Sequence, residues 1–286
     1  MINGLAIWHY PHRNPIENVI FFADKGFSSV SMLGQMMYGV CADPKQAEEL
    51  ALAVQQKGVV LTVHHKLPLS HDEEDVRDFK EAVDCMAKWQ EKYGLIDILS
   101  FDVPLKIRDN AQPYIQYVLQ YEQFLKVAVE DFGLTDQEEK QLDVFKNNKR
   151  FGYLVDIGHM YIRIRGKNKR DVTLLNNNPK ECPVTNNPGY YEFMKAFASK
   201  KFQIFEIHLH NNDGVEDLHY FFDDGTLDIK TVAKVLRDIK FDGVLTIESA
   251  PGFKFECVYP ESDERILQTF DLWKKLSVVE NKTVGS

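Results

Sequence analysis

The chain has 286 residues, of which 44% are hydrophobic and 27% are charged. This composition is typical of a soluble globular protein with a large core, and it excludes a disordered chain. Its 34 Lys and Arg residues against 43 Asp and Glu residues give a formal net charge of −9. Since an acidic protein does not attract DNA or anionic membranes, we predict no nucleic-acid partner.

The sequence also indicates where the protein resides. The first residues, MINGLAIWHY, lack a basic segment followed by a long apolar run, so we predict no signal peptide. No stretch approaches about 18 uninterrupted apolar residues, so we expect no transmembrane helix and no membrane partner. The cysteines Cys41, Cys85, Cys182 and Cys257 are scattered. They are predicted to be the reduced thiols of a cytoplasmic protein.

Short apolar runs alternate along the chain with longer segments of helical periodicity. The runs predict strands, in chain order, at residues 5–8, 29–33, 59–63, 96–101, 125–130, 152–155, 204–207 and 244–247. Helices are expected at residues 16–25, 44–57, 72–92, 114–124, 190–199, 229–239 and 262–276. The fifth run could continue the helix before it, but its two valines and strict alternation favour a strand.

Eight strands interleaved with helices require a parallel sheet. In a chain of this length they predict closure into a single (β/α)8 TIM barrel that comprises one α/β domain, residues 1–286. The alternative is an open doubly wound sheet, but neither GxGxxG nor a Walker A motif is present. Residues 163–188 break the pattern and are interpreted as a long loop inserted after the sixth strand.

Side chains that can bind metal ions follow most of the predicted strands. In chain order they are His9, His64, His65, Asp102, Glu130, Asp156, His159, His208, His210 and Glu248, and His219 lies in the loop after the seventh strand. Seven of the nine histidines therefore lie at or just beyond strand ends. Because these ends meet at one face of a barrel, the side chains should converge there.

The donor types indicate which metal such a site would bind. Imidazole and carboxylate groups without thiolate suit Mn, Mg, Co or Zn ions. Glu206, His208 and His210 share one face of their strand, and Phe205, Ile207 and Leu209 share the other, so the polar set should point into the barrel and the apolar set toward the helices. Each residue alone has a structural alternative: Asp156 could cap the next helix, and Glu130 could be a solvated helical residue.

Further polar and aromatic residues have more than one interpretation. Asp217 and His219, two residues apart, could hold a second metal, orient a substrate or belong to a solvated loop. Trp8 is expected mainly in the core, but it lies close to the predicted mouth. With His9 and His65 it is a candidate substrate contact. The basic run 163–170 could be an exposed loop or one that grips a phosphate or carboxylate of the substrate.

Three of these segments resemble one known family. They are Val-Asp-Ile-Gly-His at 155–159, Ile-His-Leu-His-Asn-Asn-Asp-Gly at 207–214 and Thr-Ile-Glu at 246–248. They are similar to the xylose isomerase-like barrel superfamily, and segments 127–131 and 62–64 resemble its fifth and third strands. This superfamily includes sugar and sugar-phosphate isomerases and epimerases, inosose dehydratases and apurinic-site endonucleases. The resemblance extends over about residues 3–275.

The resemblance to the epimerase branch implies a metal-dependent enzyme that acts on a small carbohydrate. One divalent metal would be held by Glu130, Asp156, His208 and Glu248. Glu130 and Glu248 would move a proton through a cis-enediolate, and His159 would hydrogen-bond a substrate oxygen. His208 is preferred over His210 as ligand by this resemblance alone.

The endonuclease branch implies a different centre, with two or three zinc ions. Its additional ligands would fall at His64, Asp102, His159, Asp217 and His219, although the position of Asp102 is usually His in that branch. The functional alternatives are therefore a multinuclear zinc phosphodiesterase, a lyase or dehydratase acting on a keto-sugar, and a sugar-binding barrel without catalysis. A homo-oligomer is compatible with the sequence.

Overall fold

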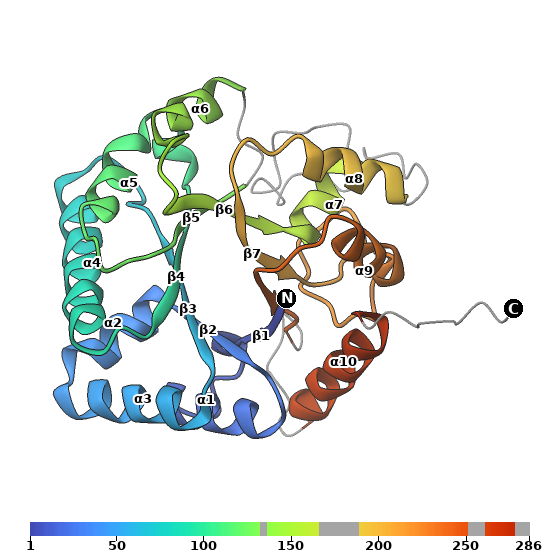
Figure 1. The fold of residues 1–286 in the computed structure, drawn as a ribbon, viewed down its shortest axis with the longest axis horizontal. Coiled ribbons are helices and arrows are strands. Elements are labelled where there is room, and N and C mark those ends of the chain that lie inside the picture. Colours follow the sequence, from blue (N-terminus) through green and yellow to red (C-terminus); the bar gives the residue numbers. More distant parts are fainter. Residues whose placement is uncertain (132–135, 166–188, 251–260, 278–286) are drawn as a thin grey trace, which may run out of the picture.

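The computed structural model describes residues 1–131, 136–165, 189–250 and 261–277. Its parallel strands close into a barrel in chain order, as Figure 1 shows. They are β1 (Ile2–Ala6), β2 (Ser29–Leu33), β3 (Val60–Lys66), β4 (Ile96–Asp102), β5 (Val127–Glu130), β6 (Phe151–Asp156), β7 (Ile204–Leu209) and β8 (Val244–Ile247). The predicted (β/α)8 barrel is confirmed, and the ambiguous fifth run is a strand. The predicted domain limits, 1–286, also include residues outside the described part of the chain.

Helices surround this ring of strands (Figure 1). They are α1 (Pro15–Asp24), α2 (Gly34–Ala42), α3 (Pro44–Lys57), α4 (Glu73–Tyr93), α5 (Gln112–Leu119), α6 (Asp136–Lys140), α7 (Ile157–Arg165), α8 (Tyr190–Ala198), α9 (Ile229–Asp238) and α10 (Glu261–Ser277). Short 3-10 helices are η1 (Ile7–His9), η2 (Leu105–Asn110) and η3 (Gln141–Phe145). The sequence marks several helix ends: Asn14 forms a capping box with Glu17, and α4 ends at Gly94, whose φ is +66°.

The structure differs from the sequence-based expectations in several places. The helix expected at residues 114–124 is α5, which ends at Leu119. The first strand spans Ile2–Ala6 rather than 5–8, because the chain leaves the sheet at Ile7 and forms η1. A short apolar run does not reveal where a strand ends. The segment expected as a loop from residue 163 begins as the last turn of α7, and residues 166–188 lie outside the described part of the chain. Helix α2 was not predicted, since Gly34 and Gly39 weaken its helical propensity.

The apolar core lies mainly between the strands and the surrounding helices. A second, smaller cluster fills the barrel interior below its polar residues: Ile98, Ala128, Leu154, Phe205 and Val244. Helix α10 is fixed to the first strand, where buried Trp273 donates a hydrogen bond to Asn3 Oδ1 over 3.0 Å. The barrel is therefore packed on both sides of its wall, which gives the mouth residues a rigid support.

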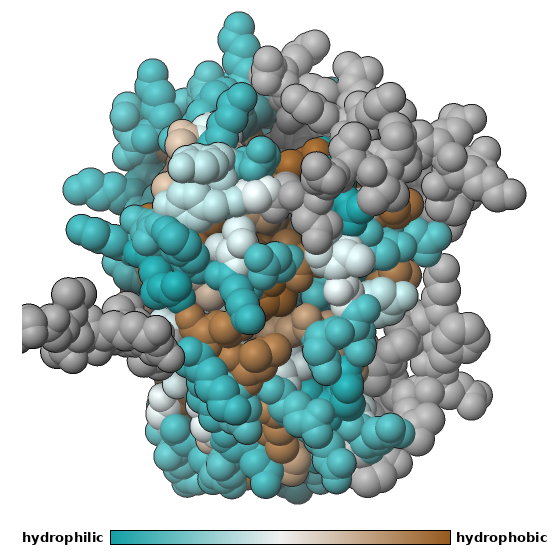
Figure 2. Space-filling model, turned by 90° about the vertical axis from the view of Figure 1, so that its right-hand side faces the viewer, coloured by the Kyte–Doolittle hydropathy of each residue, from teal (hydrophilic) through white to brown (hydrophobic). Residues whose placement is uncertain are grey.

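The described surface is largely hydrophilic on one side of the barrel (Figure 2). Figure 2 shows the face on the α8–α10 side, where hydrophilic side chains surround a central group of apolar ones. No helix among these residues is long and apolar enough to cross a membrane. Cys41 and Cys85 are free thiols, as predicted, whereas Cys182 and Cys257 lie outside the described residues.

Candidate metal centre at the barrel mouth

The inner faces of the strands carry a stack of polar side chains toward the mouth. The predicted alternation is observed on β7 for Ile207 and Leu209, which pack in the outer core, and for His208, which faces inward. Phe205, expected on the outer face, packs instead with the interior cluster, where the register between β6 and β7 shifts. The rings of His64 on β3 and His208 lie 5.1 Å apart, although these strands are not neighbours in the barrel. This contact therefore crosses the interior. The strand ends bring the predicted ligands together as the sequence suggested.

Asp156, His208 and Glu248 form the first group of possible metal ligands. One donor atom from each lies within 4.8 Å of the others, and all three residues are buried. His208 Nδ1 is 3.0 Å from Glu248 Oε2. Asp156 Oδ2 has no hydrogen-bond partner among the described residues. A buried carboxylate oxygen without a partner is costly unless a cation or water completes its coordination.

Glu130, Asp156 and His159 form a second group that shares Asp156 with the first. His159 Nδ1 lies 2.8 Å from Glu130 Oε1. The backbone N–H of His159 donates to Asp156 Oδ1 over 2.7 Å, as an N-cap of α7 would require. Both interpretations of Asp156 thus apply: one oxygen caps the helix, and the other remains available to a ligand.

His64, Asp102 and Glu130 make a third group on the β3–β5 side of the mouth. His64 Nε2 lies 3.0 Å from Asp102 Oδ1 and 3.6 Å from Glu130 Oε2. The other ring nitrogen, Nδ1, is 3.1 Å from Ser100 Oγ. Glu130 is therefore shared between two groups, as Asp156 is.

The loop after β7 completes the centre with a four-residue group: His159, His210, Asp217 and His219. Asp217 lies 3.0 Å from His159 Nε2, 3.5 Å from His210 Nε2 and 3.2 Å from His219 Nε2. The rings of His210 and His219 stack at 4.0 Å. This geometry favours the predicted role of Asp217 and His219 in the site over a solvated loop, because both are turned toward the mouth.

The two glutamates experience opposite electrostatic environments. Burial and the negative charge of Asp102 raise the pKa of Glu130 to about 7. Burial would also raise the pKa of Glu248, but His208 and His219 lower it to about 2. The two carboxyl groups therefore differ in proton affinity although both lie in the same centre.

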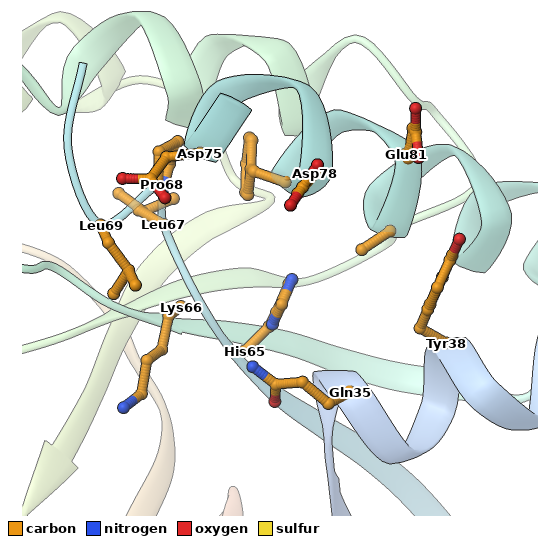
Figure 3. A pocket seen from close by; sticks show the side chains of 12 residues that line it. Gln35, Tyr38, His65, Lys66, Leu67, Pro68, Leu69, Asp75, Asp78 and Glu81 are labelled. Carbon is orange, nitrogen blue, oxygen red and sulfur yellow. The ribbon is translucent and has the colours of Figure 1, made fainter. Parts of the chain in front are cut away.

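The remaining candidates divide between the mouth and the exterior of the barrel. Trp8 and His9 are on η1 at the mouth: the Trp8 ring stacks on His64 at 6.1 Å, and His9 Nε2 is 3.9 Å from Glu248 Oε1. His65 instead points away from the interior and stacks on Phe79 at 6.3 Å. It lines a groove of about 600 Å³ between β3, α2 and α4, shown in Figure 3. His65, which was predicted to contact the substrate, is thus separated from the polar centre.

Polar residues lie beneath the ligands, and for these the sequence predicted an inward position but no role. Glu206 is fully buried and accepts hydrogen bonds from Thr62 Oγ1 (2.9 Å) and Thr246 Oγ1 (2.7 Å). Alternation had placed Glu206 on the same face as His208. Only the closed barrel, however, brings the hydroxyl groups of β3 and β8 to its carboxylate.

The donors fit a divalent ion of the Mn, Mg, Co or Zn type. Glu130, Asp156, His208 and Glu248 provide three carboxylates and one imidazole, all buried, which is a common ligand set for these ions. The unpartnered Asp156 Oδ2 supports the same conclusion. The third and fourth groups offer enough donors for further ions.

Comparison with known proteins places the chain in a family. Residues 21–276 match the sequence model described as xylose isomerase-like TIM barrel. No curated protein sequence matches the chain.

Several solved structures are similar to this chain. A D-tagatose 3-epimerase-like protein has 17% identity and a TM-score of 0.63, over 97% of this chain and 100% of that chain. D-psicose 3-epimerase from Clostridium cellulolyticum H10 has 11% identity and a TM-score of 0.67, over 98% and 100%. The 3-keto-D-glucoside 4-epimerase from E. coli has 12% identity and a TM-score of 0.65, over 96% and 99%. At such identities the likeness shows the fold alone.

Proposed function

Because the chain belongs to the family of xylose isomerase-like TIM barrels, we propose that it is a divalent-metal-dependent isomerase or epimerase. Its substrate would be a sugar, a sugar phosphate or an inositol-derived compound. The observation that carries this proposal is the convergence of Glu130, Asp156, His208 and Glu248 at the mouth, in two donor groups that share Asp156. Similar structures titled as D-psicose and D-tagatose 3-epimerases favour ketoses as the first compounds to test.

The proposed chemistry needs a metal and two carboxylates. When bound, a divalent ion acts as a Lewis acid toward the carbonyl and adjacent hydroxyl of the substrate and acidifies the neighbouring C–H. Glu130 or Glu248 removes this proton and leaves a cis-enediolate of the substrate. The other glutamate, or the same one, returns a proton to the opposite face in an epimerase or to the adjacent carbon in an isomerase.

Other mouth residues would orient the substrate. His159 lies beside Glu130, at 2.8 Å, and would donate a hydrogen bond to a substrate or enediolate oxygen. Trp8 and His9 border the same centre and offer an aromatic surface and a polar contact for a sugar ring. These roles, like the cytoplasmic location and a possible homo-oligomer, remain predictions.

Proton exchange tests the proposal directly. The wild-type protein, loaded with Mn²⁺, is incubated in deuterated water with a panel of ketoses and ketose phosphates, and deuterium incorporation next to the carbonyl is measured by NMR. Glu130→Gln and Glu248→Gln should each abolish incorporation, because each lacks an ionisable carboxyl group. Full exchange in both variants would exclude this mechanism. Loss of water from the substrate after exchange would instead indicate a dehydratase.

A multinuclear zinc phosphodiesterase is the second candidate, and one observation favours it. The additional groups His64–Asp102–Glu130 and His159–His210–Asp217–His219 could hold two further ions. Metal analysis of protein purified without chelator or affinity-tag metal separates the candidates. One ion per chain, lost in Asp156→Asn, favours the isomerase or epimerase. Two or three zinc ions, lost in part in His219→Asn, with cleavage of phosphodiesters, would favour the hydrolase.

A further inference from the structure

A buried carboxylate lies directly beneath the proposed metal ligands and has no part in the chemistry described above. Glu206 on β7 has no exposed surface. It does not belong to the predicted set of metal ligands. Burying an ionised carboxylate costs several kcal/mol unless hydrogen bonds and a positive partner compensate. The surroundings of Glu206 therefore indicate what it does.

Hydroxyl groups from three strands hold the Glu206 carboxylate in place. Thr62 on β3 and Thr246 on β8 donate to Oε1 over 2.9 Å and 2.7 Å, and Ser100 on β4 donates to Oε2 over 3.5 Å. Since β3 and β4 lie across the barrel from β7, the bonds from Thr62 and Ser100 span the interior, whereas Thr246 reaches Glu206 from the neighbouring strand. They fix the position of the carboxylate from within the barrel wall.

The same carboxylate faces one nitrogen of a proposed metal ligand. His208 Nε2 lies 3.6 Å from Glu206 Oε1, just beyond hydrogen-bond distance, and has no hydrogen-bond partner among the described residues. His208 Nδ1 lies 3.0 Å from Glu248 Oε2. Within the described residues, the ion pairs of Glu206 involve His208 alone. The two ring nitrogens thus face separate carboxylates. Nε2 faces Glu206 beneath the site, and Nδ1 faces Glu248 within the donor group.

This arrangement determines which nitrogen can bind a metal. A histidine that keeps a proton on one ring nitrogen offers the lone pair of the other, and a carboxylate next to the protonated nitrogen fixes both the tautomer and the ring orientation. We propose that Glu206 is a positioning residue, which holds the Nε2 proton of His208 and thereby presents Nδ1 to the group of Asp156 and Glu248. The inference rests on the proposed metal site.

Metal binding by the metal-free protein tests this role without an activity assay. Zn²⁺ and Mn²⁺ affinities are measured by titration calorimetry, together with the thermal midpoint of the metal-free protein. Glu206→Gln keeps the size and an acceptor but removes the charge, and we expect a 10–100-fold lower affinity. Ser31→Ala is the matched control: Ser31 is also buried, pairs with Thr62 in register, and its hydroxyl has no hydrogen-bond partner in the described structure. It should bind metal as the wild type does.

A spectroscopic measurement follows the proton itself. In the zinc-loaded wild type, the downfield imidazole N–H signal of His208 should arise from Nε2, and Glu206→Gln should weaken or lose it. Where Glu206→Gln does not fold, Glu206→Asp takes its place. It retains the charge but withdraws the carboxylate by one methylene, and a several-fold lower affinity is expected.

The outcomes separate this inference from the proposed function. Wild-type affinity in the folded Glu206 variant would overturn the positioning role, including where the variant has a lower thermal midpoint, because that result describes a purely structural residue. A wild type that binds metal but exchanges no sugar proton would overturn the proposed function and leave the role of Glu206 intact. A wild type that binds no divalent ion would overturn both.

Discussion

His64 and His65 are consecutive on β3, yet they lie in two regions with opposite character. His64 faces the barrel interior, 3.0 Å from Asp102. His65 faces the layer between the barrel and its helices, where it packs against Phe79 and Phe101. The strand alternation that separates the two side chains also separates the polar centre from the apolar core.

The two environments change the basicity of the imidazoles in opposite directions. Burial alone would lower the pKa of His64, but Asp102 raises it above its ordinary value. Burial and, to a smaller extent, the charge of His64 lower the pKa of His65 to about 4. A buried histidine is thus suited to a charged or metal-binding role only where the fold supplies carboxylates, and the interior supplies them.

The largest expected effect comes from removing one charge in the inner region. In Asp156→Asn the N-cap of α7 is retained, because Asn caps as well as Asp, but the carboxylate shared by two donor groups is lost. Since outer-shell changes alone cost about 10–100-fold, we expect metal affinity to fall by about 1000-fold. Titration calorimetry of the metal-free protein measures this change.

A second N-cap provides the control for this prediction. Asp228 caps α9, where its carboxylate accepts from Lys230 N over 3.1 Å. Asp228→Asn should therefore leave metal affinity and stability unchanged. Equal metal affinity in Asp156→Asn and the wild type would remove Asp156 from the metal centre.

The outer region should make stability depend on pH through His65. Between pH 6.5 and about 4 the unfolded chain binds a proton at this histidine that the native protein does not bind. The contribution of His65 to the free energy of unfolding is therefore fully present above pH 6.5. It declines by up to about 3 kcal/mol as the pH falls toward 4. Urea unfolding at pH 7 and pH 4.5 should show a smaller loss in His65→Leu than in the wild type. Identical losses would contradict the assignment.

Two glycines allow the regions to be compared by the same substitution. A Cβ on Gly158 would lie 2.1 Å from His210 Cε1 in the inner region, and one on Gly34 would lie 2.2 Å from His65 Nδ1 in the outer region. Both Gly158→Ala and Gly34→Ala should cost about 2 kcal/mol through overpacking. Only Gly158→Ala should also lower zinc affinity. A similar loss of affinity in Gly34→Ala would show that the two regions are coupled.

The smallest effect is expected outside both regions. Asp43 caps α3, accepting from Lys45 N over 2.9 Å. Asp43→Ala should cost about 1 kcal/mol of unfolding free energy, because a helix N–H loses its partner. Metal affinity and proton exchange should remain at wild-type levels, as measured by urea unfolding and the assays above. A change in either would mean that the centre responds to general stability rather than to its own residues.

The strand pattern could be recognised from the sequence because it depends on local chemistry. Apolar runs between helical segments predicted all eight strands, and the polar residues after them predicted the members of the centre. The first strand was displaced because a continuous apolar run, 5–8, contains no signal for the point at which Ile7 leaves the sheet. Helix α2 was missed because Gly34, which weakens its propensity, is needed where His65 packs closely.

Other features arise only when distant strands meet. Alternation required His64 and His65 to face opposite ways but did not decide which of them faces the interior, since a position at a strand end does not specify which way its side chain points. Nor could it reveal Glu206 as a partner of Thr62, 144 residues earlier in the chain. The sequence by itself determined the barrel class and the chemical types of the ligands, because periodicity and residue type are local properties. The tertiary structure decided which donors share an ion-sized space and which carboxylate supports His208, because closure of the barrel alone sets distances across its interior.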